Sequence, residues 1–208
     1  MKKISVLCAL CSVLFLSACG GTKVVDLDDK SAVADMNDVM ELEYRDWTKT
    51  AGHMVDSMVK SGAFRQIKNP VIAVGRVTND TMQRFDTDIL VKKIRTELVN
   101  SGRAQVTTAM RTTGAAEDEI THQTRELRGN AEYDASTIVG GGTLVAANMS
   151  LTGKMIQRNL HVETCWLCAH QERVEYYLQM TLTDVKTGLS VWEDEQPIIK
   201  EGRNAPKW

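Results

Sequence analysis

The alternation that decides the fold is QERVEYYLQMTLT, residues 171–183. Apolar side chains occupy every second position from Val174 to Leu182, and mostly polar side chains lie between them. This period of two residues is typical of a β-strand with one buried face. The next residues, KTG at 186–188, predict a tight turn, because glycine readily adopts the positive φ that such turns require. The chain then returns from Leu189 as an antiparallel strand.

Further strands are predicted upstream of this hairpin. Residues 151–162 read as a third strand, and the change of apolar phase between Met155 and Ile156 predicts a bulge there. The β-branched run at 71–74 is typical of a strand buried on both faces. Residues 104–106 would begin another strand. The sheet is therefore expected to mix parallel and antiparallel strands.

Three segments show apolar residues at helical spacing. The sets are Trp47, Ala51, Met54 and Met58; Leu90, Ile94 and Leu98; and Ile120 with Leu127. The first helix is predicted from Asp46 to a stop at Gly62, and the second from a cap at Asp86 or Thr87 to Gly102. The third covers residues 113–128 and is more polar, with its two apolar residues turned inward.

Together these elements predict one α/β (α+β) domain over residues 46–208. Its mixed sheet has four or five strands, helices pack on its faces, and the C-terminal strands are antiparallel. The formal net charge of −2, with both signs interspersed, gives no indication of a nucleic-acid surface. No run after the first residues is long and apolar enough to be a transmembrane helix.

The N-terminus predicts secretion and a lipid anchor. Lys2 and Lys3 precede a short apolar run, so residues 1–18 are typical of a signal peptide. The sequence LSAC at 16–19 resembles the bacterial lipobox, in which the cysteine receives diacylglycerol; Cys19 is therefore the predicted lipidation (palmitate) site. Gly20 stands where aspartate would favour the inner membrane, which favours the periplasmic face of the outer membrane. Residues 19–45 are predicted to be a flexible tether.

A cluster of cysteines and histidines lies at 161–170. In the oxidising periplasm a disulfide between Cys165 and Cys168 is the favoured interpretation, with free thiols as one alternative. The other is a zinc site in which His161 and His170 join the two cysteines. We favour no metal and no cofactor. His53 and His122 lie on predicted helices without a paired nucleophile, so we interpret them as structural or surface residues.

Two places are candidates for contact with a partner. The polar segment from Asn79 and Asp80 to Arg84 follows a buried strand, at the rim of the sheet, where binding residues concentrate. The alternative is an Asx-type turn, with the arginine paired to a nearby aspartate. Tyr177 lies on the polar face of its strand. It is either covered by a helix, the interpretation we favour, or exposed as an interface anchor.

Several segments resemble the LpoB family, outer-membrane lipoproteins that activate penicillin-binding proteins. They are NDTMQRFDT at 79–87, LTGK at 151–154 with QR at 157–158, and VEYY at 174–177 through LTDVKTG at 182–188 to WE at 192–193. The resemblance covers roughly residues 64–202. It implies a TolB-N-terminal-like, CsgG-like fold and adds Arg158 to the candidate contacts.

The resemblance also implies a function. The expected role is a non-enzymatic activator that binds the regulatory domain of a bifunctional penicillin-binding protein and stimulates peptidoglycan synthesis, and hence affects cell shape. No small-molecule substrate is expected. A CsgG-like subunit of a secretion channel is the alternative, and a periplasmic zinc or redox enzyme is a third class that rests only on the cysteine–histidine cluster.

The tether departs from the family pattern, because it is short. At about 3.3–3.6 Å per residue, fifteen extended residues span about 50 Å and twenty-six span about 90 Å. Such a tether must still let the domain meet a synthase anchored in the inner membrane.

Overall fold

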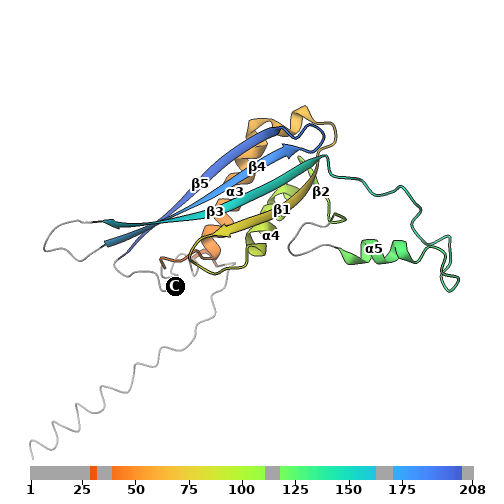
Figure 1. Cartoon of the computed structure of the whole chain (residues 1–208), viewed down its shortest axis with the longest axis horizontal. Coiled ribbons are helices and arrows are strands. Elements are labelled where there is room, and N and C mark those ends of the chain that lie inside the picture. The colour runs from red at the N-terminus through yellow and green to blue at the C-terminus, as the bar shows by residue number, and fades with distance from the viewer. Residues whose placement is uncertain (1–28, 32–38, 111–117, 163–170, 203–208) are drawn as a thin grey trace, which may run out of the picture. The chain divides into compact units, whose positions relative to one another are not determined.

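Five strands form one sheet in the order β2-β1-β3-β4-β5 (Figure 1). The strands are β1 (Val71–Asp80), β2 (Gln105–Val106), β3 (Met149–Val162), β4 (Gln171–Asp184) and β5 (Ser190–Gly202). β1 runs parallel to both β2 and β3, whereas β3, β4 and β5 are antiparallel. The predicted mixed α/β sheet with C-terminal antiparallel strands is confirmed.

The computed structural model describes residues 29–31, 39–110, 118–162 and 171–202. Its contacts divide the chain between Asp38 and Val39, and every element named here lies in the second unit. Among the described residues, no helix has the length and apolar character needed to span a membrane.

Two long helices, α3 (Tyr44–Ser61) and α4 (Asp88–Ser101), pack on the same face of the sheet (Figure 1). Both end at glycines with left-handed backbones, Gly62 (φ 79°) and Gly102 (φ 63°), as predicted from the sequence. The buried residues of both helices join one core with alternate residues of the strands, among them Ile72, Val74, Leu151, Met155, Tyr176, Leu178 and Leu182. We call this side the inner face and the opposite side the outer face.

The expectation that a helix covers Tyr177 is wrong for the described part of the chain. Tyr177 alternates with Tyr176 and Leu178, which face the helices, so it lies on the outer face and is half-buried. The extensive helix-to-strand contacts of the described residues are made by α3 and α4. The sequence already indicated this arrangement. Apolar and polar side chains alternate over residues 171–183, which is typical of a strand with only one buried face.

The predicted bulge at Met155 and Ile156 is also wrong. The pairing of β3 with β4 runs without a shift from Met149 opposite Asp184 to Val162 opposite Gln171. The change of apolar phase arises because Met155 is buried on the inner face and Ile156 is half-buried on the outer face. The register shifts lie instead in β1, between Val74 and Val77, and between β4 and β5.

The third helix is shorter and less buried than predicted. α5 spans Glu119–Glu126, and Ile120 is 65% exposed instead of facing inward. Leu127 is only partly buried. Arginine side chains connect the helix to the following loop, because Arg128 donates through Nε to the carbonyl of Val139 at 2.8 Å and through Nη2 to that of Gly140 at 2.7 Å. Polar contacts with a loop thus replace the expected apolar packing.

Candidate interaction surface

An apolar strip crosses the outer face of the sheet. Tyr177 of β4 stands directly opposite Ile156 of β3 and Pro197 of β5, so the three side chains form a row across three strands. Ile199, one outer-face position further along β5, is 56% exposed. Ile156 and Tyr177 are half-buried, whereas Pro197 is exposed. An apolar row with an aromatic residue at its centre is typical of the anchor region of a protein interface.

Polar and charged residues border this strip. Lys154 of β3 forms an ion pair with Asp80 of β1 at 2.6 Å, and both side chains are about half exposed. On the β5 side, the amide of Gln179 donates to the carboxylate of Glu195 at 2.7 Å. We define the outer patch as Asp80, Lys154, Ile156, Arg158, Glu175, Tyr177, Gln179, Glu195, Pro197 and Ile199. Its apolar centre and polar rim match the usual anatomy of an interface.

The ring of Tyr177 is held by its neighbours on the outer face. Its hydroxyl donates to Oε2 of Glu175 at 2.6 Å, and the Glu175 residue is 7% exposed. Nη1 of Arg158 lies 4.0 Å from the same oxygen, with 65% of its side chain exposed. The hydrogen bond to Glu175, together with burial, raises the pKa of Tyr177, so the phenol is neutral at physiological pH. The patch therefore presents an oriented aromatic ring beside an accessible guanidinium.

The five predicted contact residues divide between the outer face and the loop after β1. Asp80, Arg158 and Tyr177 share the outer patch, because Asp80 is paired with Ile156 and Arg158 with Glu175. Arg84 is exposed in the loop at 81–87.

Asn79 belongs to a turn instead of the patch. Its Oδ1 accepts hydrogen bonds from Thr81 N at 3.1 Å and Thr81 Oγ1 at 2.7 Å, and its Nδ2 donates to the carbonyl of Gln83 at 3.0 Å. The Asx-type alternative is thus the one the structure supports for this residue. The sequence placed both Asn79 and Asp80 in a loop, whereas β1 includes both.

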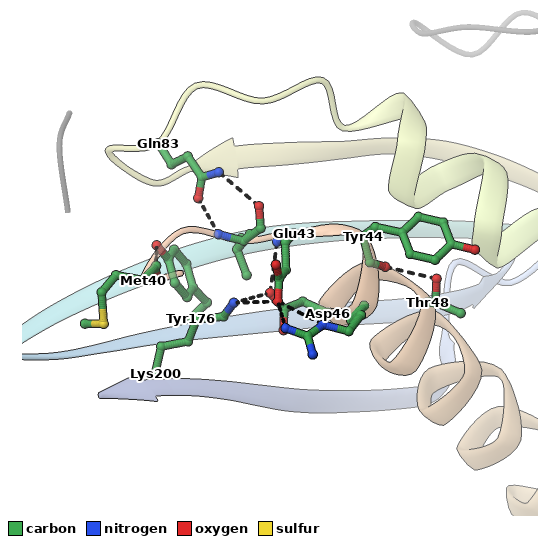
Figure 2. A network of polar contacts seen from close by, with 10 residues as sticks. Met40, Glu43, Tyr44, Asp46, Thr48, Gln83, Tyr176 and Lys200 are labelled. Carbon is green, nitrogen blue, oxygen red and sulfur yellow. Dashed lines mark hydrogen bonds and ion pairs between the residues drawn. The ribbon is translucent and has the colours of Figure 1, made fainter. Parts of the chain in front are cut away.

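The segment that enters the domain is fastened to the loop after β1 (Figure 2). The backbone N–H of Leu42 donates to Oε1 of Gln83 at 2.8 Å, and Nε2 of Gln83 donates to the carbonyl of Leu42 at 3.2 Å. One side-chain amide thereby reproduces the pair of hydrogen bonds that a neighbouring strand would make. Leu42 is buried at 6% exposure.

The same segment is fastened to β4 and β5 (Figure 2). The hydroxyl of Tyr176 donates to the carbonyl of Met40 at 3.2 Å, and Lys200 Nζ lies 2.6 Å from Asp46 and 3.7 Å from Glu43. Burial, and then the negative charges of Glu41 and Asp46, raise the pKa of Tyr176. We name residues 40–46 with these partners the N-terminal junction.

The junction corrects the sequence-based boundary at residue 45, because residues 40–45 lie against the domain and not in the tether. Glu43 and Asp46 form a reciprocal capping box at the start of α3, a spacing that could have been noticed in the sequence. Gln83 and Lys200 carry no such signal, since their partners are distant in the chain.

The cysteine–histidine cluster falls mostly outside the described residues. Cys165, Cys168 and His170 lie outside them, and His161 lies in β3. In the ranges that the structure describes, no group of three or more potential ligands could hold a metal ion. The disulfide therefore stays a prediction.

The two remaining histidines are surface residues, as interpreted from the sequence. His53 is exposed on α3, and His122 is exposed with Nε2 2.7 Å from the carbonyl of Ala109.

Comparison with known proteins gives one family match. The family model described as "Peptidoglycan-synthase activator LpoB" matches residues 46–198. The LpoB C-terminal domain from Salmonella enterica is 16% identical with a TM-score of 0.44, covering 74% of this chain and 98% of that one. The same domain from Escherichia coli is 17% identical with a TM-score of 0.42 and the same coverage. The NMR structure of E. coli LpoB is 15% identical, with a TM-score of 0.41, covering 88% of this chain and 80% of that one. A comparison with curated proteins gives no match.

Proposed function

Because the chain belongs to the LpoB family of peptidoglycan-synthase activators, we propose that it binds a bifunctional penicillin-binding protein and stimulates its peptidoglycan synthesis. Binding is made to a regulatory domain of the synthase, and the protein itself catalyses no reaction and needs no cofactor. Its location in this proposal is the periplasmic face of the outer membrane. The family match favours this role over the CsgG-like channel subunit.

The outer patch is the observation that carries the proposal. Tyr177 offers a large apolar surface with little conformational freedom to lose, because Glu175 already holds its hydroxyl. Aromatic and arginine side chains account for a large share of the binding energy in most protein interfaces. The patch supplies both, with Arg158 beside the tyrosine. In the proposal the synthase covers the row formed by Ile156, Tyr177 and Pro197.

The charged residues at the border of the outer patch would set the orientation in which the proposed partner binds. The ion pair of Asp80 with Lys154 lies towards β1, and the carboxylate of Glu195 lies towards β5, so charged groups border two sides of the apolar row. A partner with complementary charges would be steered to one orientation, and wrong orientations would bring like charges together. The association rate is therefore expected to fall with added salt more than the dissociation rate changes.

The test compares variants of the full chain in detergent for binding and stimulation of purified bifunctional penicillin-binding proteins of its host. Tyr177→Ala should weaken binding at least about tenfold, as expected for a central aromatic anchor. Glycan polymerisation should be stimulated only at correspondingly higher concentrations. Tyr133→Ala is the control, because Tyr133 is a tyrosine that is 49% exposed in the loop between α5 and β3, outside the patch.

Two results would count against the proposal. Stimulation that is equally strong with Tyr177→Ala would exclude the outer patch as the docking face. Failure of the unchanged protein to bind any bifunctional synthase of the host would exclude the function itself.

The lipid anchor is a separate part of the proposal. Removal of residues 1–18 would leave Cys19 as the N-terminus, modified with acyl chains that each contribute about 0.8 kcal/mol per buried methylene. Labelled palmitate should be incorporated into the unchanged protein and into Cys165→Ser, but not into Cys19→Ser. Labelling that persists in Cys19→Ser would rule out this attachment site.

A further inference from the structure

β3 continues beyond the end of β1, so its last residues have a neighbouring strand on one side only in the described part of the chain (Figure 1). Pairing with β1 ends at Ile156, whereas pairing with β4 continues to Val162. Gln157 and Asn159 occupy alternate positions of this extension, on the inner face. Both side chains contact Met82, in the loop that follows β1.

Three hydrogen bonds close a ring through Met82. The backbone N–H of Met82 donates to Oε1 of Gln157 at 2.9 Å, and Nε2 of Gln157 donates to Oδ1 of Asn159 at 2.7 Å. Nδ2 of Asn159 then donates to the sulfur of Met82 at 3.3 Å. Because the bond from Gln157 fixes the oxygen end of the Asn159 amide, the nitrogen end is aimed at the sulfur. We call this arrangement of Met82, Gln157 and Asn159 the amide ring.

Met82 is also the most exposed methionine in the described part of the chain. Its exposed fraction is 60%, and that of Met110 is 44%. The other methionines described there are buried or partly buried: Met40, Met54, Met58, Met149, Met155 and Met180. The sulfur of Met82 therefore combines access from solvent with a hydrogen-bond donor in a fixed position.

We propose that Met82 is a site of reversible oxidation to the sulfoxide by hydrogen peroxide, and that the Asn159 amide holds the sulfoxide oxygen. A sulfur lone pair attacks one peroxide oxygen, so that the S–O bond forms as the O–O bond breaks. The proton on the transferred oxygen passes to the departing hydroxide, which leaves as water. The sulfur loses two electrons, and the peroxide gains them. Two thiols restore the thioether through a methionine sulfoxide reductase, with a disulfide and water as products.

The fixed position of the donor gives the oxidation a preferred stereochemistry. Oxidation makes the sulfur a chiral centre, so the sulfoxide has two epimers. The Asn159 amide lies to one side of the sulfur and favours the epimer whose oxygen points towards it. A thioether sulfur is only a weak acceptor, whereas the sulfoxide oxygen is strongly polar. Oxidation of Met82 therefore tightens the amide ring and holds the loop more firmly against β3.

The test treats the full chain in detergent with hydrogen peroxide and follows each methionine by peptide mapping. Met82 should be oxidised before Met110 and before the buried methionines. Chromatography of the Met82 peptide separates the two epimers, and each is assigned with the reductase specific for it. One epimer should exceed the other at least about threefold, as expected for one hydrogen bond of ordinary strength.

Asn159→Asp separates the donor from the shape of the side chain. The carboxylate keeps the acceptor that Gln157 uses but cannot donate to the sulfur, so the two epimers should form in similar amounts. Asn100→Asp is the matched control, because it makes the same change at an exposed asparagine of α4 and should leave the ratio unchanged. The unchanged protein gives the epimer ratio by itself, so the inference is tested even if Asn159→Asp does not fold.

Hydrogen exchange gives a second measurement of the tightened ring. Exchange at the Met82 amide, which donates to Gln157, should slow at least about threefold after oxidation, while exchange in the centre of β4 stays unchanged.

Four results would each overturn the inference. They are equal amounts of the two epimers in the unchanged protein, an unaltered ratio in Asn159→Asp, oxidation of Met110 ahead of Met82, and exchange at the Met82 amide that is no slower after oxidation. The inference does not depend on the proposed function. Tyr177→Ala should leave the epimer ratio unchanged, and Asn159→Asp should leave stimulation of the synthase unchanged, so the two proposals fail separately.

Discussion

Two adjacent tyrosines have opposite tasks because they lie on opposite faces of one strand. Tyr176 is fully buried against the helices and donates its hydrogen bond to Met40, whereas Tyr177 is half-buried on the outer face and bonded to Glu175. The pKa of each phenol is raised, for Tyr176 first by burial and for Tyr177 first by its hydrogen bond. Adjacent tyrosines are thus used differently: Tyr176 packs in the core, and Tyr177 is available on the outer face for the proposed contact with a partner.

The buried tyrosine predicts a loss of stability at alkaline pH. Its pKa is raised in the folded state, so its proton stabilises the fold fully below the unfolded value of about 10, and this contribution is lost as pH rises above it. Tyr176→Phe should cost about 1 kcal/mol near pH 7, through loss of the hydrogen bond to Met40. Urea unfolding should show the deficit shrinking or reversing near pH 11.

Tyr133→Phe is the control for this series, because Tyr133 is 49% exposed and has no comparable burial. Its stability relative to the unchanged protein should be almost independent of pH. A deficit of Tyr176→Phe that stays constant up to pH 11 would contradict the assigned pKa shift.

At the scale of single elements, two glycines with similar sequence surroundings have opposite expected responses to alanine. Gly52 lies inside α3, and a Cβ there would meet no atom within 4 Å. A Cβ on Gly153 of β3 would lie 2.9 Å from the carbonyl oxygen of Gln179 and 3.1 Å from the side chain of Met180. The first glycine weakens a helix, whereas the second permits close approach of two strands.

Gly52→Ala should therefore raise the free energy of unfolding by about 0.5–1 kcal/mol, because alanine favours the helix. Gly153→Ala should lower it by about 1–3 kcal/mol, since β3 and β4 must separate or bend. Chemical denaturation of both variants measures the difference. Equal effects in the same direction would show that the contacts around Gly153 relax freely.

The sequence predicted elements well where one physical signal dominates. The spacing of Leu90, Ile94 and Leu98 predicted the buried side of α4, and all three are fully buried. The prediction of burial failed where apolar residues are isolated in the sequence. Ile120 has no neighbouring apolar segment with which to form a core, and it is exposed. Ile156 breaks the alternation of its strand. The sequence alone could not distinguish a bulge there from an apolar side chain on the outer face.

The outer patch could be predicted only in part for a related reason. Alternation placed Tyr177 on the polar side of its strand, but it could not supply the register that sets Ile156 and Pro197 beside it. Register is decided by packing across the whole sheet. The contact between Gln83 and Leu42 could not be predicted from the sequence, because the two residues lie 41 positions apart.

At the scale of the whole molecule, the junction sets where the proposed tether begins. Taking Cys19 as the lipid site and Met40 as the first fastened residue leaves about 20 residues, which span at most about 70 Å. Deleting residues 25–34 would halve this reach. The deletion should abolish stimulation in cells while leaving that of the purified protein in detergent unchanged.

Replacing residues 25–34 by a glycine–serine segment of equal length is the control, and it should preserve function in cells. Equal function of the deleted and replaced chains would show that reach does not limit the protein.

The junction itself can be tested by removing two of its polar contacts together. Gln83→Ala removes both hydrogen bonds to Leu42, and Lys200→Met removes the ammonium beside Asp46. Hydrogen exchange at the Leu42 amide should become at least about tenfold faster in the double variant, while exchange in the centre of β4 stays unchanged. Lys186→Met, in the exposed turn, is the matched control.

The fastening of residues 40–43 has a mechanical consequence. Tension from a membrane anchor would reach one amide side chain, one phenol and one ammonium before it reached the paired strands. These few contacts would yield first and release about 15 Å of extra chain without unfolding the sheet. In the proposed membrane-anchored protein, a thicker or strained envelope would then lengthen the connection by releasing residues 40–43, while the sheet and its outer patch kept their shape.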